Sequence, residues 1–99
     1  MAGYILTNKA IDDLSVIWDY TFEVWSEGQA DKYYYMLLGH CQDLVDDKAF
    51  AKNYPEINEG VFGSRSGQHI IFYRRLSLSK IEIIRILHSR MDLKNKLKD

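Results

Sequence analysis

The chain has 99 residues and a net charge of −1, which predicts one small domain, residues 1–99, and argues against a general nucleic-acid binder, a class with a strongly basic surface. Its single cysteine, Cys41, excludes an internal disulfide and fits a reducing compartment. No apolar run reaches the roughly 18 residues needed to cross a bilayer, and the N-terminal residues show no secretory signal. We therefore expect a cytoplasmic protein without membrane contact.

The small net charge hides a division between the two halves of the chain. Residues 1–50 hold three lysines against nine acidic residues, a net charge of −6. Residues 51–99 hold ten lysines and arginines against five acidic residues, a net charge of +5. Fields of this kind steer charged partners toward a surface without choosing the fold. We expect the second half to project a positive field.

The chain begins with a predicted strand and helix. Residues 3–6, with the sequence GYIL, suit a short strand, and Thr7 or Asn8 can cap the helix that follows. Apolar residues then recur at spacings of three and four over residues 10–25, while most acidic side chains lie off that stripe. This pattern predicts an amphipathic helix that ends near Ser26.

A second helix is predicted directly after the first. Gly28 is the expected breaker in the turn, and helical spacing resumes over residues 30–45 and runs to about Asp47 or Lys48. Cys41 lies on the apolar stripe, where a small core residue is expected. Two helices joined by a few residues lie antiparallel, so residues 8–48 should form a helical hairpin.

Three antiparallel strands are predicted in the second half. Pro55 and several glycines rule out a third long helix. The alternating run HIIFYRRL and the β-branched run IEIIRILH predict strands over about 59–66, 68–75 and 81–88, with residues 77–80 as a hairpin connection. The order strand-helix-helix-strand-strand-strand predicts an α+β fold.

In this fold the helical hairpin packs on one face of a three- to four-stranded, mainly antiparallel sheet, because that face is the only large apolar partner available. Alternation puts Ile70, Phe72 and Leu76 on one face and His69, Ile71, Tyr73 and Arg75 on the other. We expect the face that carries His69, Tyr73 and Arg75 to stay open.

Arg85 stands in the middle of the most apolar predicted strand. A buried arginine is normally paired, and Glu56, Glu82 and Asp92 are candidate carboxylates, with Asp92 the preferred partner. The face that Arg85 occupies depends on the strand register, because a shift of one residue exchanges the two faces.

The chain has few signs of catalytic or metal chemistry. It contains no phosphate-binding glycine loop with its lysine, no Ser-His-Asp or Cys-His signal, and no histidine with ligand-spaced partners, so no cofactor, metal or catalytic residue is predicted. An acid–base phosphodiesterase stays open as an alternative, because histidines move protons near neutral pH and arginines stabilise phosphorane charge. Its candidate residues are Arg65, His69, Tyr73, Arg75, Arg85 and His88.

Three stretches together resemble the ParE family of toxins from bacterial toxin–antitoxin modules. Residues 10–37 are similar to its first two helices through Asp13-Leu14, Ile17-Trp18, Tyr20, Trp25, Gln29-Ala30 and Tyr33. Residues 54–75 resemble its strands, and residues 81–92, with Arg85-Ile86-Leu87-His88 and Arg90-Met91-Asp92, resemble its C-terminal signature. The sequence departs from the family pattern at Ala51-Lys52 and Phe62-Gly63.

The resemblance implies a fold shared with the RelE ribosome-dependent ribonucleases. It implies a non-enzymatic toxin that poisons DNA gyrase and blocks replication, and a ParD-type antitoxin that neutralises it within a hetero-oligomer. It implies no sequence-specific DNA binding by the toxin alone. Two alternatives are a ribosome-dependent mRNA endonuclease, using His69, Arg85 and His88, and an inert or decoy interaction module.

Two sets of binding residues follow as hypotheses. An antitoxin segment would add a strand to a sheet edge and lay an amphipathic helix beside the hairpin. Its candidate contacts are Trp18, Trp25, Tyr34, Leu38, Arg74 and Arg75. Candidate gyrase contacts cluster at the exit of the last strand and in the basic tail, at His88, Arg90, Met91, Lys94, Lys96 and Lys98.

Overall fold

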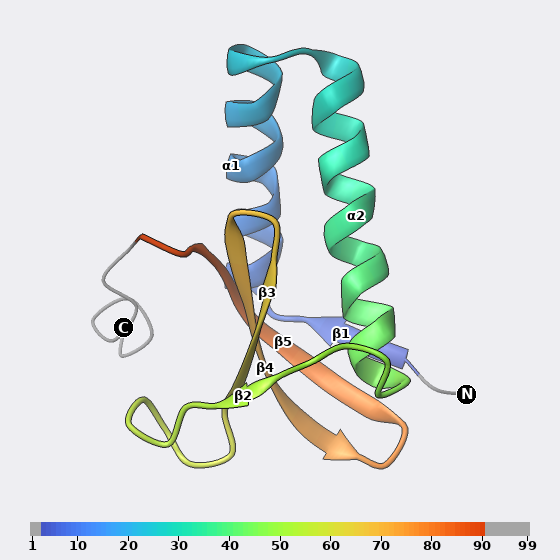
Figure 1. The fold of residues 1–99 in the computed structure, drawn as a ribbon, viewed down its shortest axis with the longest axis vertical. Helices are drawn as coiled ribbons and strands as arrows, with labels where there is room; N and C mark the ends of the chain where they lie inside the picture. Colours follow the sequence, from blue (N-terminus) through green and yellow to red (C-terminus); the bar gives the residue numbers. More distant parts are fainter. Residues whose placement is uncertain (1–2, 91–99) are drawn as a thin grey trace.

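The computed structural model describes residues 3–90 and has an α+β architecture in which two helices cover one face of a twisted sheet (Figure 1). The elements are β1 (Gly3–Leu6), α1 (Asn8–Val24), α2 (Glu27–Val45), β2 (Lys52–Asn53), β3 (Phe62–Ser66), β4 (His69–Ser77) and β5 (Lys80–His88). The predicted α+β fold and its order of elements are confirmed, with the short strand β2 added. Neither helix is long and apolar enough to span a membrane, as far as residues 3–90 are concerned.

A residue with a hydroxyl side chain caps the N-terminus of each helix. Oγ1 of Thr7 accepts a hydrogen bond from the Ala10 amide at 3.1 Å, and Oγ of Ser26 accepts one from the Gln29 amide at 3.1 Å. Both bonds satisfy amides that have no partner within their helix. The prediction that Gly28 breaks the chain between the helices is wrong, because Ser26 caps α2 and Gly28 lies inside its first turn.

The sheet has five strands in the order β1-β5-β4-β3-β2. β1 runs parallel to β5, and the other neighbours are antiparallel. The parallel pair requires a long crossover, which α1 and α2 begin. β2 contributes only two residues, paired with Gly63 and Phe62, which is too short for a sequence pattern to reveal.

The helices cover the face of the sheet that was expected to stay open. Ile71 and Tyr73 of β4 are buried with residues of α1 and α2 in the main core. Ile70 and Phe72 pack on the opposite face against Tyr54 and other residues of the segment that precedes β3. The prediction was wrong because both alternating sets of β4 are apolar, so alternation alone does not choose the face that meets the helices.

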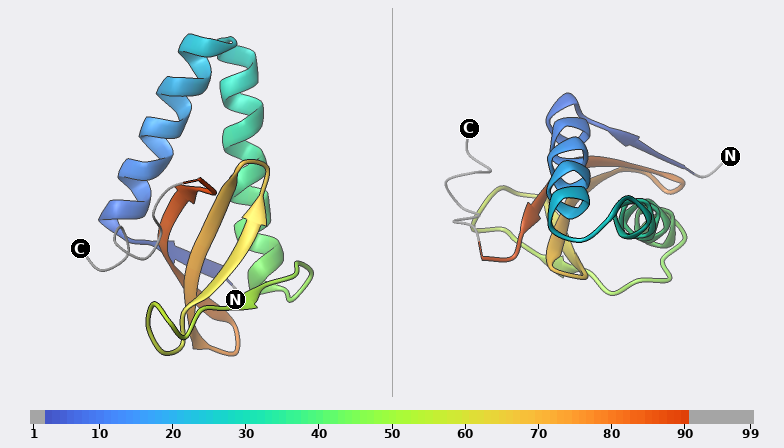
Figure 2. Two further views of the ribbon diagram at one scale, coloured as in Figure 1. Left: turned by 60° about the vertical axis from the view of Figure 1, so that its left-hand side comes forward. Right: turned by 90° about the horizontal axis from the view of Figure 1, so that it is seen from above.

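The hairpin is longer than the face it covers. In Figures 1 and 2 the far ends of α1 and α2 stand clear of the sheet. Ala10, Leu14 and Ile17 of α1 are buried, whereas Trp25 at its far end is 73% exposed. The apolar stripe of α1 therefore starts in the core and continues onto an exposed surface.

Candidate functional site

A cleft of about 830 Å³ lies beneath the projecting half of the hairpin. α1 and α2 form one wall, and the neighbouring ends of β4 and β5 form the floor. Its lining residues are Asp13, Val16, Ile17, Tyr20, Thr21, Trp25, Gln29, Tyr33, Gln68, His69, Arg85, Ile86, Leu87, His88 and Arg90. This cleft is larger than the second pocket, which is described below. It contains Arg85, His88 and Arg90, three of the polar residues that the sequence singled out near the end of β5.

The wall of the cleft formed by α1 is apolar and accessible. Val16 and Tyr20 are 67% and 66% exposed, and Trp25 continues the same surface one turn farther on. A contiguous exposed surface of this kind is typical of a protein–protein contact, and tyrosine and tryptophan are common anchors in such contacts.

A β-bulge in β5 determines where Arg85 lies. Phe72 of β4 pairs with Arg85 and Tyr73 pairs with Ile83, so Ile84 is an extra residue on β5. Because of this extra residue, Ile83 and Ile86 both lie in the core beneath the helices, which strict alternation does not allow.

The bulge is held by residues at the start of α1. Nε and an Nη of Arg85 donate to the carboxylate of Asp13 at 2.8 and 2.9 Å, and the Ile86 amide donates to the same carboxylate at 3.0 Å. On the other side of the bulge, Oγ1 of Thr7 donates to the Ile84 carbonyl at 2.8 Å. Polar groups displaced from the ladder thus gain partners on the helix, and Arg85 joins α1 to the sheet.

The carboxylate partner of Arg85 was not among those predicted. Asp13 takes this role from 72 positions away along the chain, while Glu82 pairs with Arg74 at 3.0 Å on the opposite face of the sheet. Asp92, the preferred partner, lies outside the described residues.

The floor of the cleft contains a chain of hydrogen bonds. The Gln68 amide donates to the hydroxyl oxygen of Tyr33 at 3.0 Å, and that oxygen lies 2.6 Å from Nδ1 of His69. Burial, together with the neighbouring His88, lowers the pKa of His69 to about 4, although Asp13 opposes this shift. His69 is therefore neutral at physiological pH.

The Tyr33 hydroxyl has one proton to donate. Nδ1 of His69 lies nearer to it than the Ser66 carbonyl, at 2.6 Å against 3.5 Å. The shorter contact favours donation from the hydroxyl to Nδ1. Because a neutral imidazole has one donor and one acceptor nitrogen, a His69 that accepts at Nδ1 carries its proton on Nε2.

His88 lies edge-on to His69, with ring centroids 5.3 Å apart and an interplanar angle of 76°. The two residues are cross-strand partners at the ends of β4 and β5. The Arg90 amide donates to Nδ1 of His88 at 3.1 Å, so the proton of a neutral His88 is also on Nε2.

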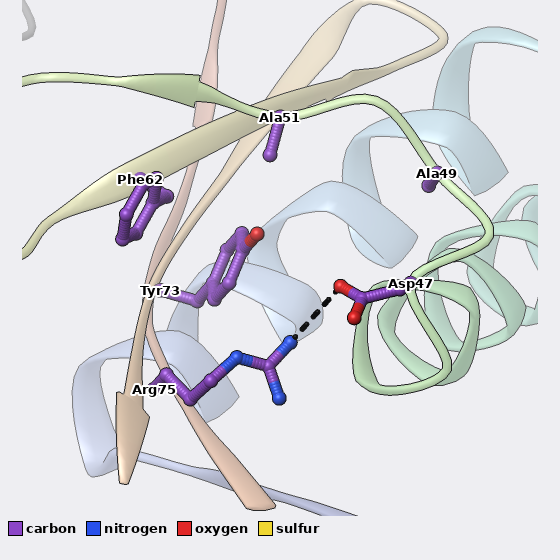
Figure 3. A pocket seen from close by; sticks show the side chains of 6 residues that line it. All are labelled: Asp47, Ala49, Ala51, Phe62, Tyr73 and Arg75. Carbon is purple, nitrogen blue, oxygen red and sulfur yellow. Dashed lines mark hydrogen bonds and ion pairs between the residues drawn. The ribbon is translucent and has the colours of Figure 1, made fainter. Parts of the chain in front are cut away.

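A smaller pocket of about 280 Å³ lies at the other end of the sheet (Figure 3). Tyr73 and Arg75 of β4 line it together with Phe62, Asp47 and two alanines. Arg75 donates to the Leu44 carbonyl at the end of α2 and to the Asp47 carboxylate, both at 3.3 Å, so its guanidinium joins the helix terminus to the sheet. This use of the guanidinium leaves the pocket poorly suited to bind an anion.

Comparison with known proteins agrees with this fold and sequence pattern. Residues 4–93 match the family model described as the ParE toxin of the type II toxin–antitoxin system parDE. The chain belongs to the ParE toxin family.

Individual ParE relatives cover nearly the whole chain. It is 33% identical to Toxin ParE1 of Mycobacterium tuberculosis over 98 residues, 95% of this chain and 96% of the relative. It is 30% identical to Toxin ParE of Escherichia coli over 99 residues, 100% of this chain and 96% of the relative.

Solved structures share the fold. The chromosomal ParDE system from P. aeruginosa matches with a TM-score of 0.69 and 22% identity, covering 89% of this chain and 96% of that one. The toxin–antitoxin complex RelBE2 of Mycobacterium tuberculosis matches with a TM-score of 0.56 and 17% identity, covering 88% and 96%.

In this ParE-family toxin the residues suggested for antitoxin binding lie in different places. Trp25 lines the cleft, whereas Trp18 stacks on Phe22 and donates from Nε1 to Asp31 across the hairpin at 2.9 Å. Tyr34 and Leu38 are partly buried against the main core. Arg74 and Arg75 lie on opposite faces of the sheet, each in an ion pair.

Two of the residues suggested for gyrase contact, His88 and Arg90, line the cleft. Met91, Lys94, Lys96 and Lys98 lie outside the described residues. The phosphodiesterase candidates do not converge on one site, because His69, Arg85 and His88 meet at the cleft while Tyr73 and Arg75 line the smaller pocket. Within residues 3–90, no group of three or more histidine, cysteine or acidic side chains is placed to hold a metal.

The sequence did not single out several residues of the cleft as functional. Val16 and Tyr20 lie off the apolar stripe, and Gln68 lies in the turn between β3 and β4. The sequence of α1 did contain a signal for this site. Large apolar side chains such as Val16 and Tyr20 lie outside the stripe that packs in the core, and exposed apolar residues that are grouped in this way indicate a binding surface.

Proposed function

We propose that this toxin poisons DNA gyrase and that a ParD-type antitoxin neutralises it within a hetero-oligomer. The observation that carries the proposal is the match to ParE toxins over residues 4–93, with relatives that align over nearly their whole length. Inhibition is proposed to come from binding, without a covalent step by the toxin.

The geometry of the cleft supports binding more than ribonuclease chemistry. The guanidinium of Arg85 is bonded to Asp13 through two of its nitrogens, and its side chain is only 16% exposed. This guanidinium is therefore poorly placed to stabilise the negative charge that develops on a phosphate in the transition state. His69, with a pKa lowered to about 4, is almost wholly unprotonated near neutral pH and so cannot serve as a general acid there.

The proposed gyrase contacts are His88 and Arg90, which line the cleft, and the residues Met91, Lys94, Lys96 and Lys98, which follow them in the sequence. Their common feature is position at and after the exit of β5, in the half of the chain with net charge +5. A truncation after Leu93 that kept full gyrase poisoning would remove the three lysines from this set.

The proposed antitoxin contacts are Trp18, Trp25, Tyr34 and Leu38, with Arg74 and Arg75. Trp25 has the strongest support, because it is exposed and lines the cleft. The two arginines have the weakest support, because carboxylates of the toxin already pair with them.

Purified gyrase gives the direct test. The toxin should inhibit supercoiling of relaxed plasmid DNA and trap cleavage complexes that appear as linear DNA, and the antitoxin encoded beside it should reverse both effects. A folded toxin with no effect on gyrase, together with mRNA cleavage in a translation extract, would favour the ribosome-dependent endonuclease instead.

A further inference from the structure

Two histidines at the floor of the cleft, His69 and His88, present ring nitrogens to a bound ligand. His69 and His88 use Nδ1 as an acceptor, toward Tyr33 and the Arg90 amide, so each has its donor on Nε2. Neither Nε2 has a hydrogen-bond partner among residues 3–90.

The nearest carboxylate does not use these donors. The two oxygens of Asp13 accept three hydrogen bonds, two from Arg85 and one from the Ile86 amide. The charge of Asp13 is thereby balanced by Arg85. The exposed guanidinium of Arg90 adds a positive charge at the edge of the cleft.

A metal ion is a poor occupant of this floor. A histidine binds a metal through a nitrogen that carries no proton, and the Arg90 amide occupies that nitrogen in His88. In His69 the same nitrogen faces the Tyr33 hydroxyl at 2.6 Å. A ligand that brings acceptors fits the arrangement without any change of tautomer.

We propose that the Nε2–H groups of His69 and His88, with Arg90, form a carboxylate-binding subsite that takes an acidic side chain of the antitoxin. This inference rests on the proposed neutralisation by antitoxin and names a subsite for it. Charge complementarity and the apolar wall together favour a peptide that carries an acidic residue beside aromatic or aliphatic ones. The acidic residue would bind the floor while its neighbours cover Tyr20 and Trp25.

The test compares two variants of one donor. His88→Gln keeps an N–H group near the position of Nε2, whereas His88→Leu has similar volume and no donor. We expect His88→Leu to weaken binding of the purified antitoxin roughly tenfold to a hundredfold in calorimetry, and His88→Gln to stay within about threefold of the wild type. Lys80→Met, at the opposite end of β5, is the matched control and should bind like the wild type.

The outcomes separate this subsite from the broader proposal. Equal affinity of His88→Leu and the wild type would overturn the subsite while leaving neutralisation intact. A wild-type toxin that binds no antitoxin would overturn both. A single-stranded oligonucleotide that binds the wild type and loses affinity with His88→Leu, while antitoxin affinity does not change, would show that the donors serve phosphates instead.

The tautomers give a readout independent of any partner. Two-bond nitrogen–proton NMR correlations distinguish Nδ1–H from Nε2–H imidazoles. In the free toxin we expect the neutral form of each imidazole to carry its proton on Nε2. An Nδ1–H form of either residue would overturn the arrangement of donors on which the subsite depends.

Discussion

The two halves of the helical hairpin differ in their surroundings: the base packs on the sheet, whereas the far end is exposed. At its base, Leu14 of α1 and Leu37 of α2 are buried against the sheet. At its far end, Trp25 of the same stripe is exposed and lines the cleft, with the exposed Tyr20 beside the stripe. The amphipathic pattern is continuous through both halves. The stripe becomes an exposed surface where the helices extend past the end of the sheet. The length of the sheet therefore determines this boundary, and the helix sequence alone does not reveal it.

Arg85 and Arg75 extend the comparison to the two ends of the sheet. Arg85 and its partner Asp13 have side chains that are 16% and 13% exposed, whereas Asp47, the partner of Arg75, is 88% exposed. An ion pair is costly to break where water cannot replace the lost partner. The buried pair beside the cleft should matter far more to stability than the exposed pair.

The largest predicted difference is between the losses of unfolding free energy when the carboxylate of Asp13 or that of Asp47 is removed. Asp13→Ala removes the carboxylate that pairs with Arg85 and accepts from the Ile86 amide, so we expect it to lower the free energy of unfolding by roughly 3–5 kcal/mol. Asp47→Ala should cost less than about 1 kcal/mol. Urea denaturation measures both, and similar losses would contradict the distinction between the two pairs.

Truncated side chains in α1 should show a smaller difference in stability between the base and the far end of the hairpin. Leu14→Ala removes a fully buried side chain and should cost roughly 2–4 kcal/mol of unfolding free energy. Trp25→Ala removes a much larger but exposed side chain and should change it by no more than about 0.5 kcal/mol. The same denaturation series tests this, and a large loss with Trp25→Ala would mean that the far end is part of the core.

The functional counterpart concerns affinity. Tyr20→Ala with Trp25→Ala should weaken antitoxin binding by at least about tenfold, because exposed aromatic anchors contribute strongly to protein interfaces. Leu78→Ala, which truncates a side chain 95% exposed in the β4–β5 turn, is the control and should leave the affinity unchanged. Calorimetric titration measures both, and an unchanged affinity of the double variant would place the antitoxin elsewhere.

The smallest effect concerns pH. The pKa of His69 falls from 6.5 to about 4 on folding, so the unfolded chain binds a proton that the folded protein does not. The resulting stabilisation is complete above pH 6.5 and is lost as the pH falls toward about 4. Unfolding free energy should therefore decrease more steeply from about pH 7 to about pH 5 in the wild type than in His69→Gln. Equal slopes would contradict a neutral His69.

Sequence patterns predicted the helices, the order of elements and the antiparallel strands, because these follow from local periodicity and turn residues. They did not predict which face of β4 meets the helices, since Ile70 and Phe72 are as apolar as Ile71 and Tyr73. The bulge at Ile84 was also invisible, because an extra residue in a β-branched run changes neither composition nor turn signals.

The site shows the same limit. Sequence placed His88 and Arg90 at a common strand exit, and both line the cleft. It did not connect Tyr33 with His69 or Asp13 with Arg85, because these contacts join α2 and α1 to the sheet across 36 and 72 positions of chain. Such pairings depend on register and helix placement, which periodicity does not specify.

The most direct test asks whether the exposed far end of the hairpin is needed for neutralisation by antitoxin but not for inhibition of gyrase. Purified gyrase is supplied with wild-type toxin or with the Tyr20→Ala, Trp25→Ala double variant, and supercoiling is measured over a range of antitoxin concentrations. We expect both toxins to inhibit gyrase, and antitoxin to restore supercoiling with the wild type at concentrations that fail with the variant. Equal restoration with both toxins would contradict the assignment of the exposed far end of the hairpin to antitoxin binding.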